Sequence, residues 1–198
     1  MKISSAKFAG SSTRVQQRPD PRLPEFAFIG RSNVGKSSLI NMLCNNGKLA
    51  LTSSTPGKTK VVNHFLINGS WYLVDLPGYG YASLPEKARR ELREVVSDYL
   101  LNSENLAGLF VLVDCRFDIP KTDIDFISEL YDHSLPFSII FTKTDKIGPK
   151  ALQEQMFRDQ EILGQLFGEY PAMLCSSSSK ARGREEILEF IENILNTL

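Results

Sequence analysis

The residues of this sequence with the clearest chemistry form one glycine-bounded string. Apolar residues at 26–29 lead into it, and residues 38–43 after it have the pattern of a helix. The string reads Gly30-Arg31-Ser32-Asn33-Val34-Gly35-Lys36-Ser37. Between a strand and a helix, such a loop turns successive amide N–H groups toward one point, and the helix N-terminus adds its positive dipole end. The spacing predicts a nucleotide-phosphate site in which Lys36 reaches the β- and γ-phosphates and the Ser37 hydroxyl binds Mg²⁺.

A second polar group follows the apolar run at residues 71–74, in the string Asp75-Leu76-Pro77-Gly78. A carboxylate at the C-terminal end of a strand lies in the crevice where open α/β sheets bind ligands. Asp75 is expected to hold Mg²⁺ through its water shell, because Mg²⁺ keeps several waters. The Gly78 amide is expected to bond the γ-phosphate, with Leu76 and Pro77 beside the nucleotide. A D-x-x-G string alone is common, and its position after a phosphate loop and a strand makes it informative.

A third string, Thr142-Lys143-Thr144-Asp145, follows the apolar run at residues 137–141 and is similar to the guanine-reading N-K-x-D motif. One carboxylate can accept both the N1–H and the N2–H₂ of guanine, which predicts Asp145 as the reader of the base. Adenine would leave that carboxylate unpaired. The aliphatic stem of Lys143 can cover the purine ring. Thr142 replaces the Asn that is usual at this position and that tethers the motif through its side chain. The shorter Thr hydroxyl is expected to replace this tethering only in part. The alternative is an ordinary surface turn after a strand.

A fourth string, Cys175-Ser176-Ser177-Ser178-Ser179-Lys180, follows the apolar run at residues 172–175. Its position matches the short loop whose backbone amides face guanine O6 in GTP-binding proteins. Ser176, Ser177 and Ser178 are therefore counted as nucleotide-binding residues. Taken alone, the string is only a polar loop. The nucleotide-binding interpretation depends on its position in the sequence after the other three motifs.

The elements that must position these strings alternate in type. Short apolar runs lie at residues 26–29, 61–67, 71–74, 109–113, 137–141 and 172–175, and helical periodicity lies at 86–101, at 122–131 and in a stripe from 187 to 198. This alternation predicts an α/β fold with a mostly parallel sheet covered by helices on both faces. Asn68-Gly69 between two strand runs predicts one antiparallel hairpin at a sheet edge. We expect a single domain at 25–198, preceded by a basic extension at 1–24.

Composition sets wider limits on the function. Hydrophobic residues make up 42% of the 198 residues and charged residues 23%, as in ordinary globular domains. Lys+Arg and Asp+Glu are equal at 23 each, so any nucleic-acid surface must be a local patch. Cys44, Cys115 and Cys175 are too far apart for a disulfide framework or a zinc knuckle and are expected to be core thiols. The N-terminal residues lack the apolar run of a signal peptide, and no segment approaches the length of a membrane span, which predicts a cytoplasmic protein.

Taken together, the motifs resemble those of the EngB (YihA/YsxC) family of Ras-like bacterial GTPases, associated with ribosome assembly. The resemblance rests on the phosphate loop and on Thr55-Pro56-Gly57-Lys58-Thr59, Asp75-Leu76-Pro77-Gly78-Tyr79-Gly80-Tyr81-Ala82 and Thr142-Lys143-Thr144-Asp145. It implies GTP hydrolysis to GDP, binding to the large ribosomal subunit or its precursor, and an indirect role in cell division. It also implies a first switch at 51–61, where Thr59 joins Ser37 in the Mg²⁺ shell and Gly57, Lys58, Lys60 and Val61 line the nucleotide.

The hydrolytic machinery is incomplete in the sequence. Many GTPases orient the attacking water with a Gln after the D-x-x-G glycine, and Tyr79 occupies that position here, so slow intrinsic hydrolysis is expected. Lys36, Asn33 and Thr59 form the predicted catalytic set. Asn33 resembles the residue that holds K⁺ in potassium-dependent GTPases, and the alternative is that it only supports the loop. His64 and His133 are expected to be structural.

Two other functions compete with a GTP-hydrolysing switch. A nucleotide-gated binding module with negligible hydrolysis is favoured by Tyr79. A P-loop nucleoside or nucleotide kinase is disfavoured by the guanine motif and by the lack of an Arg-rich lid segment. RNA contact by the basic N-terminal arm or by Lys180, Arg182 and Arg184 is a further hypothesis, against the alternative of solvated surface charge.

Overall fold

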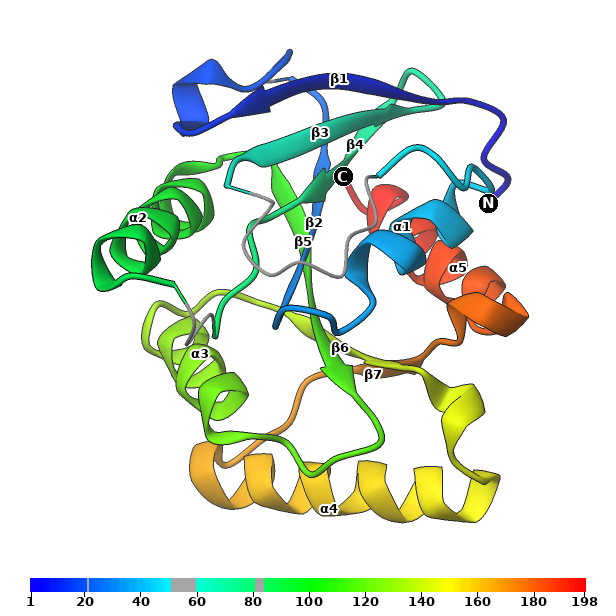
Figure 1. Cartoon of the computed structure of the whole chain (residues 1–198). Helices are drawn as coiled ribbons and strands as arrows, with labels where there is room; N and C mark the ends of the chain where they lie inside the picture. The colour runs from blue at the N-terminus through cyan, green and yellow to red at the C-terminus, as the bar shows by residue number, and fades with distance from the viewer. Residues whose placement is uncertain (21, 51–59, 81–83) are drawn as a thin grey trace.

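The computed structural model describes residues 1–20, 22–50, 60–80 and 84–198 (Figure 1). Within them, one seven-stranded sheet has the order β1-β3-β4-β2-β5-β6-β7. Its strands are β1 (Ala6–Ser12), β2 (Glu25–Gly30), β3 (Val62–Ile67), β4 (Trp71–Asp75), β5 (Leu106–Asp114), β6 (Ser138–Thr142) and β7 (Met173–Cys175). The α-helices are α1 (Lys36–Leu43), α2 (Glu86–Asn102), α3 (Lys121–Asp132), α4 (Pro149–Phe167) and α5 (Arg184–Leu195). The pairs from β4 to β7 are parallel, as the alternation of elements predicted.

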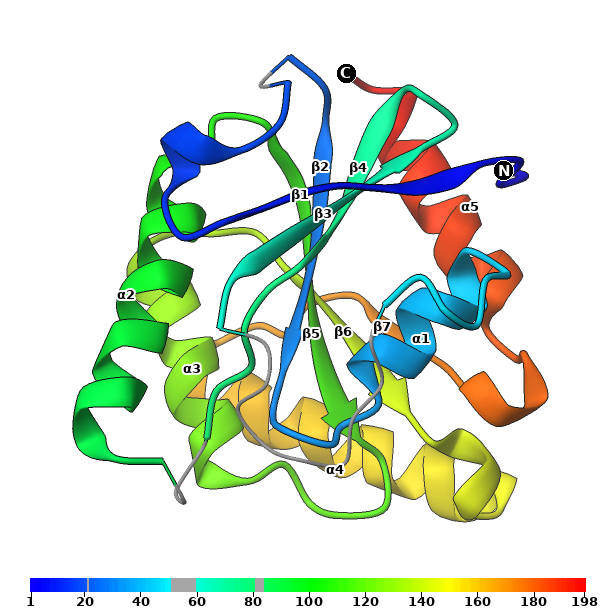
Figure 2. The same ribbon diagram turned by 45° about the horizontal axis from the view of Figure 1, so that its top comes forward.

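Helices cover both faces of the sheet because its central strands are apolar on both sides. Along β2, Phe26 and Phe28 pack with α1 and α5, whereas Ala27 and Ile29 pack with α2 and α3. This alternation follows from the period of two along a strand. Figure 2 shows α1 and α5 on one side of the sheet and α2 and α3 on the other. A third cluster, which includes Leu163 of α4, packs α3 and α4 against β5 and β6.

The hairpin predicted at Asn68-Gly69 is confirmed, but it does not form the edge of the sheet. Both residues have positive φ, 51° and 68°, and the Ser70 amide closes the turn on the Ile67 carbonyl at 3.0 Å. β1 pairs antiparallel with β3 and lies outside the hairpin. The basic extension expected at residues 1–24 thus contains the edge strand of the sheet. The Asn68 side chain helps to fix it, because its carbonyl oxygen accepts from the amides of Ser4 and Ser5.

Several basic residues considered for RNA contact have partners within the fold. Arg18 is nearly buried, and its Nε lies 3.8 Å from Glu25 Oε1. The Arg184 Nε lies 3.1 Å from the carbonyl oxygens of Met42 and Leu43, at the end of α1. A cation there satisfies helix carbonyls and suits the negative end of the dipole. Lys180 and Arg182 remain exposed.

The stripe expected to run to residue 198 ends earlier, since α5 stops at Leu195 and Leu198 is exposed. The cysteines are free thiols, with Cys44 and Cys115 buried and Cys175 half-buried. None of the helices within the described residues combines the length and apolar composition needed to span a bilayer.

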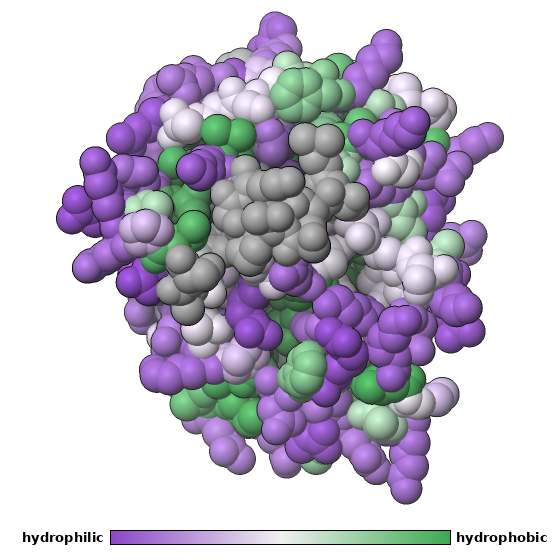
Figure 3. All heavy atoms as spheres, viewed as in Figure 1, coloured by the Kyte–Doolittle hydropathy of each residue, from purple (hydrophilic) through white to green (hydrophobic). Residues whose placement is uncertain are grey.

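The two histidines lie in different surroundings. His64 is fully buried in β3, and burial lowers its pKa to about 4. His133 follows the last residue of α3. On the face drawn in Figure 3, hydrophilic side chains predominate and apolar ones form separate patches.

Candidate nucleotide-binding site

The predicted motifs meet at one edge of the sheet because five parallel strands end there. The last residues of these strands are Gly30 of β2, Asp75 of β4, Asp114 of β5, Thr142 of β6 and Cys175 of β7. In open α/β sheets, the carboxyl ends of the strands are where ligands bind. Each of the four predicted strings begins at the last residue of one of these strands, namely Gly30, Asp75, Thr142 and Cys175.

The phosphate loop has the backbone shape that the glycines predicted. Gly35 has φ 106° directly before α1, and Asn33 is also left-handed at φ 62°. At Gly30, an added Cβ would lie 2.9 Å from the Leu112 carbonyl oxygen, so only glycine fits between β2 and β5. The loop therefore enters α1 tightly, with its amides at the helix N-terminus, which is an anion-binding geometry.

Lys36 and Asp75 form an ion pair across the mouth of the sheet, between the first residue of α1 and the last of β4. Their side chains are 10% and 4% exposed, so each charge depends on the other for neutralisation. Ser37, the next residue of α1, is half-buried. A hydroxyl and a carboxylate supply the oxygen donors that Mg²⁺ prefers, and a phosphate would suit the Lys36 ammonium, so these residues fit a magnesium nucleotide.

Lys143 joins the guanine motif to the phosphate loop. It adopts a left-handed backbone, φ 61°, and its ammonium donates to the Asn33 carbonyl at 2.7 Å and to Asp114 Oδ2 at 2.8 Å. Its Cε lies 3.9 Å from the Cβ position of Gly35. The aliphatic stem therefore extends alongside the loop, where it can cover a base whose phosphates the loop holds.

Asp114 is a residue of this site that the sequence interpretation missed. Its carboxylate accepts from Lys143 and, at 2.8 and 2.9 Å, from the Arg116 guanidinium. Burial opposes its charge, but these hydrogen bonds prevail and lower the pKa of Asp114 to about 2. The sequence pattern that predicted Asp75, a carboxylate at the C-terminal end of an apolar strand, is also present at Asp114.

Thr142 contacts the phosphate loop directly. Its hydroxyl donates to the Val34 carbonyl at 2.7 Å, with the Val113 carbonyl at 3.2 Å as a weaker acceptor. Thr142 is buried, so this bond is shielded from water. The sequence suggested that a Thr would replace an Asn tether only in part, and the short hydroxyl spans the distance because β6 and the loop lie close together.

The serine loop holds the predicted base reader. The Ser177 hydroxyl donates to Asp145 Oδ1 at 2.7 Å, and the Lys146 ammonium lies 3.1 Å from Oδ2. These contacts, with Ser177 the strongest, hold the pKa of Asp145 well below its usual range. The Thr144 amide and hydroxyl both reach the Ser176 carbonyl, at 3.2 and 3.1 Å. Asp145 is thus an ionised acceptor fixed by two neighbouring loops.

Gly183 closes the serine loop and was not singled out in the sequence. The Ser177 and Arg182 backbones pair with each other at 3.1 Å in both directions, and Gly183 follows with φ 78°. An added Cβ there would lie 1.8 Å from the Cys175 carbonyl oxygen. In the sequence, Gly183 is visible only as a glycine directly before a helix. The reason that glycine is needed there, the close approach of its backbone to the Cys175 carbonyl, is seen only in the structure.

Tyr79 packs away from the nucleotide edge, against α3. Its ring stacks on Phe126 with centroids 4.5 Å apart, and its backbone bridges to Arg31 of the phosphate loop. The Arg31 Nε lies 3.2 Å from Oδ1 of buried Asp123. Burial raises the pKa of Asp123 to about 6, and burial together with the Asp123 charge raises that of Tyr79 well above its ordinary value.

The first switch is only partly described. Gly57, Lys58 and Thr59 lie outside the described residues, so their predicted roles are not tested by the structure. Lys60 is exposed and Val61 half-buried at the start of the described segment. Leu76, Pro77 and Gly78 are buried directly after β4, and Ser178 begins a 3-10 turn (Ser178–Lys180).

The fold and the geometry of this site define a P-loop GTPase with a Ras-like domain. A family model described as "50S ribosome-binding GTPase" matches residues 25–143. A probable GTP-binding protein EngB of Phocaeicola vulgatus is 50% identical over 198 residues, covering 100% of this chain and 99% of that protein. One of Porphyromonas gingivalis is 50% identical over 194 residues, covering 98% and 96%. The chain belongs to the EngB family of GTP-binding proteins.

Solved structures agree with this assignment. The crystal structure of a probable GTP-binding protein engB has a TM-score of 0.68 and 25% identity, and the match covers 88% of this chain and all of that one. Era in complex with MgGDPNP and nucleotides 1506–1542 of 16S ribosomal RNA has a TM-score of 0.64 at 22% identity, over 85% of this chain and 55% of that one. The second likeness concerns the fold alone.

Proposed function

We propose that the protein hydrolyses GTP to GDP and phosphate at a slow intrinsic rate and acts in the cytoplasm as a nucleotide-dependent switch in assembly of the large ribosomal subunit. An indirect role in cell division follows from that activity. The observation that carries the nucleotide assignment is Lys143, whose ammonium bonds the Asn33 carbonyl while Asp145 is held by Ser177. Base reader and phosphate loop form one rigid unit, which favours a guanine nucleotide.

In this proposal, the phosphates of GTP would take Lys36 from its pair with Asp75, and the Asp75 carboxylate would then be free to hold Mg²⁺ through water. Ser37 and Thr59 would hold the ion, which would supply charge stabilisation for phosphoryl transfer. The Gly78 amide binds the γ-phosphate and responds to its loss. Gly78 precedes Tyr79, whose backbone bridges to Arg31. A movement of Gly78 would therefore also displace Tyr79 and its contacts with the phosphate loop and α3.

The packing of Tyr79 supports slow hydrolysis. Its ring lies against Phe126 and its hydroxyl oxygen is buried, so it does not orient an attacking water. The missing group would then come from a partner, from a different side chain, or from K⁺ held by Asn33. The same observation favours the second candidate, a nucleotide-gated binding module with negligible hydrolysis. A single-turnover assay with and without large subunits separates the two, since only a hydrolase releases phosphate.

The ribosomal role is supported by the description of the matching family model, "50S ribosome-binding GTPase". Sedimentation with purified small and large subunits tests it. We expect the protein to pellet with large subunits in the presence of GMPPNP and much less with GDP. Equal pelleting in both nucleotides, or with small subunits alone, would contradict the proposed switch.

A further inference from the structure

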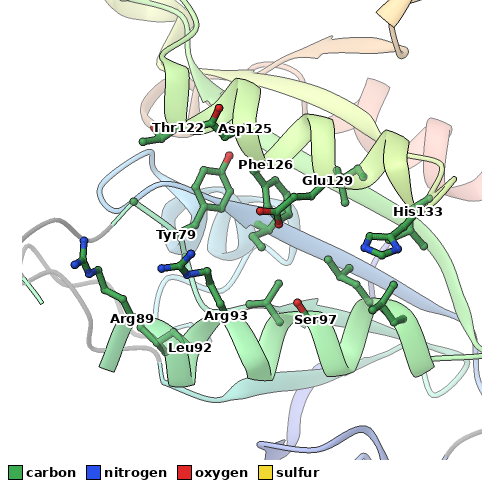
Figure 4. A pocket seen from close by; sticks show the side chains of 18 residues that line it. Tyr79, Arg89, Leu92, Arg93, Ser97, Thr122, Asp125, Phe126, Glu129 and His133 are labelled. Carbon is green, nitrogen blue, oxygen red and sulfur yellow. The ribbon is translucent and has the colours of Figure 1, made fainter. Parts of the chain in front are cut away.

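A groove of about 580 Å³ runs between α2 and α3, beyond the nucleotide edge (Figure 4). Its floor is apolar, formed by Leu92 and Val96 of α2 with Phe126 and Leu130 of α3. Tyr79 lies at one end, between the N-terminal halves of the two helices (Figure 4). This volume is in the range of specific binding pockets, and the floor suits a few apolar side chains.

The two walls of the groove carry opposite charge. Arg89 and Arg93 line it from α2, whereas Asp125 and Glu129 line it from α3 (Figure 4). Asp125 pairs with Lys121 of its own helix at 2.9 Å, and among the described residues no ion pair joins the two walls. Apart from that exposed pair within α3, the charges of the two walls face the space between the helices, where a ligand would lie.

We propose that this groove docks an amphipathic helix of a protein partner, with its apolar face on the floor, carboxylates toward the α2 wall and cationic side chains toward the α3 wall. Helix-in-groove recognition uses such a row of apolar anchors, and rim charges provide selectivity. An RNA strand fits less well, because its phosphates would face Asp125 and Glu129. The switch function proposed above is needed only for the nucleotide dependence of this docking.

Tyr79 connects the groove to the nucleotide. Its amide lies 3.4 Å from the Gly30 carbonyl, and its ring stacks on Phe126 in the groove floor. A shift of Gly78 toward the γ-phosphate moves the next residue, Tyr79, and with it the end of the groove. We therefore expect the helix to bind the GTP-analogue form and the GDP form with different affinities.

The first test uses fluorescein-labelled helical peptides with leucines at i, i+4, i+7 and i+11 and flanks of Glu/Lys, Glu/Glu or Lys/Lys. Anisotropy with the full-length protein should give saturable binding that is strongest for the Glu/Lys peptide. Because exposed charge pairs contribute up to about 1 kcal/mol, the preference should be roughly fivefold. Glu129→Lys should shift it toward the Glu/Glu peptide, whereas Asp132→Lys, outside the groove lining, should not. No saturable binding, or a preference that Glu129→Lys leaves unchanged, overturns the proposal.

The second test blocks the groove without deleting core atoms. Ser97→Trp adds a large side chain at an exposed lining position, and Glu94→Trp adds the same ring on the outer face of α2. We expect at least about a tenfold loss of peptide affinity for Ser97→Trp only, with fluorescent-GDP affinity unchanged in both, since a blocked anchor pocket typically costs over 1 kcal/mol. Equal losses in the two variants would contradict a groove site.

The same variants identify the occupant in sedimentation with large subunits and with protein-free 23S rRNA. Loss of subunit binding in Ser97→Trp, with rRNA binding unchanged, supports a ribosomal protein helix. If Ser97→Trp loses binding to the rRNA, the groove binds RNA. If the wild type is a dimer that Ser97→Trp dissociates, the groove binds a second copy of the chain. Either result overturns the proposal. If the wild type ignores subunits yet binds the Glu/Lys peptide, the ribosomal function fails and the groove assignment stands.

Discussion

The Thr142 hydroxyl lies 2.7 Å from the Val34 carbonyl oxygen, so the strand that ends in the guanine motif holds the phosphate loop directly. Thr142→Val keeps the shape and removes the donor, leaving a buried carbonyl without this bond. We expect a loss of about 1–2 kcal/mol in the free energy of unfolding and weaker GDP binding. Denaturant unfolding and fluorescent-GDP titration measure both. Thr142→Ser keeps the hydroxyl and serves as the control; if it loses as much GDP affinity as Thr142→Val, the hydrogen bond is not the cause.

Asp145 is expected to determine base choice. Asp145→Asn replaces two acceptors by an acceptor and a donor, which suits xanthine better than guanine. GDP affinity should fall by roughly 10²-fold or more, because a buried polar edge is left mismatched, and XDP should compete better than GDP. Ser177→Ala is the control, since it removes the bond to Asp145 Oδ1 but leaves the carboxylate, and should weaken binding without changing the preference. A variant that still prefers GDP rules out Asp145 as the reader.

Gly183 and Gly168 have the same φ, 78°, but different surroundings. A Cβ at Gly183 would meet the Cys175 carbonyl at 1.8 Å, whereas at Gly168 nothing lies within 4 Å. Gly168→Ala should therefore cost only about 1 kcal/mol for its positive φ. Gly183→Ala should cost roughly 4 kcal/mol or more and open the serine loop. Thermal unfolding with and without GDP gives both values, and similar melting temperatures for the two variants would contradict the close approach.

The buried carboxyl of Asp123 predicts a pH dependence of stability. Its pKa is raised from 3.8 to about 6, mainly by burial, so between these values the folded state holds a proton that the unfolded state has released. Raising the pH through this window therefore destabilises the fold, by up to about 3 kcal/mol by pH 7.

Asp123→Asn stays neutral and should lack this part of the decline. Its stability relative to wild type should increase from pH 4 to pH 7, as measured by denaturant unfolding at fixed ionic strength. Curves for the two proteins that stay parallel across the window would show that Asp123 does not titrate there. The Arg31 guanidinium, 3.2 Å from Oδ1, opposes the effect of burial on this pKa and so already limits the difference.

The role of Asn33 can be decided by its response to cations. If its side chain holds K⁺, GTP turnover should be faster in KCl than in NaCl at equal ionic strength, with and without large subunits. Asn33→Gly is the sharper variant, because glycine adopts φ 62° without the strain that alanine would carry there. It should abolish the difference between salts and leave GDP affinity nearly unchanged. Equal rates in both salts under all conditions would remove the cation and leave Asn33 as a support of the loop.

The sequence by itself determined the features that depend on local chemistry. The phosphate loop, the Asn68-Gly69 turn and the alternation of strands and helices after residue 25 follow from backbone freedom, turn propensity and periodicity, which act over a few residues. The ends of the central strands were predicted to within a few residues for the same reason. The guanine motif was recognisable because Asp145 directly follows a buried apolar run.

Only the tertiary structure decided which distant residues meet. β1 was missed because an edge strand exposed along most of its length has no alternating apolar pattern to reveal it. The need for glycine at position 183 comes from the nearby backbone of Cys175, and the ion pair of Arg31 comes from the position of Asp123 in α3. The groove exists because of how α2 and α3 pack over the sheet. Hydrophobic periodicity records that a side chain is buried but not which partner buries it, so these contacts arise only when the elements pack together.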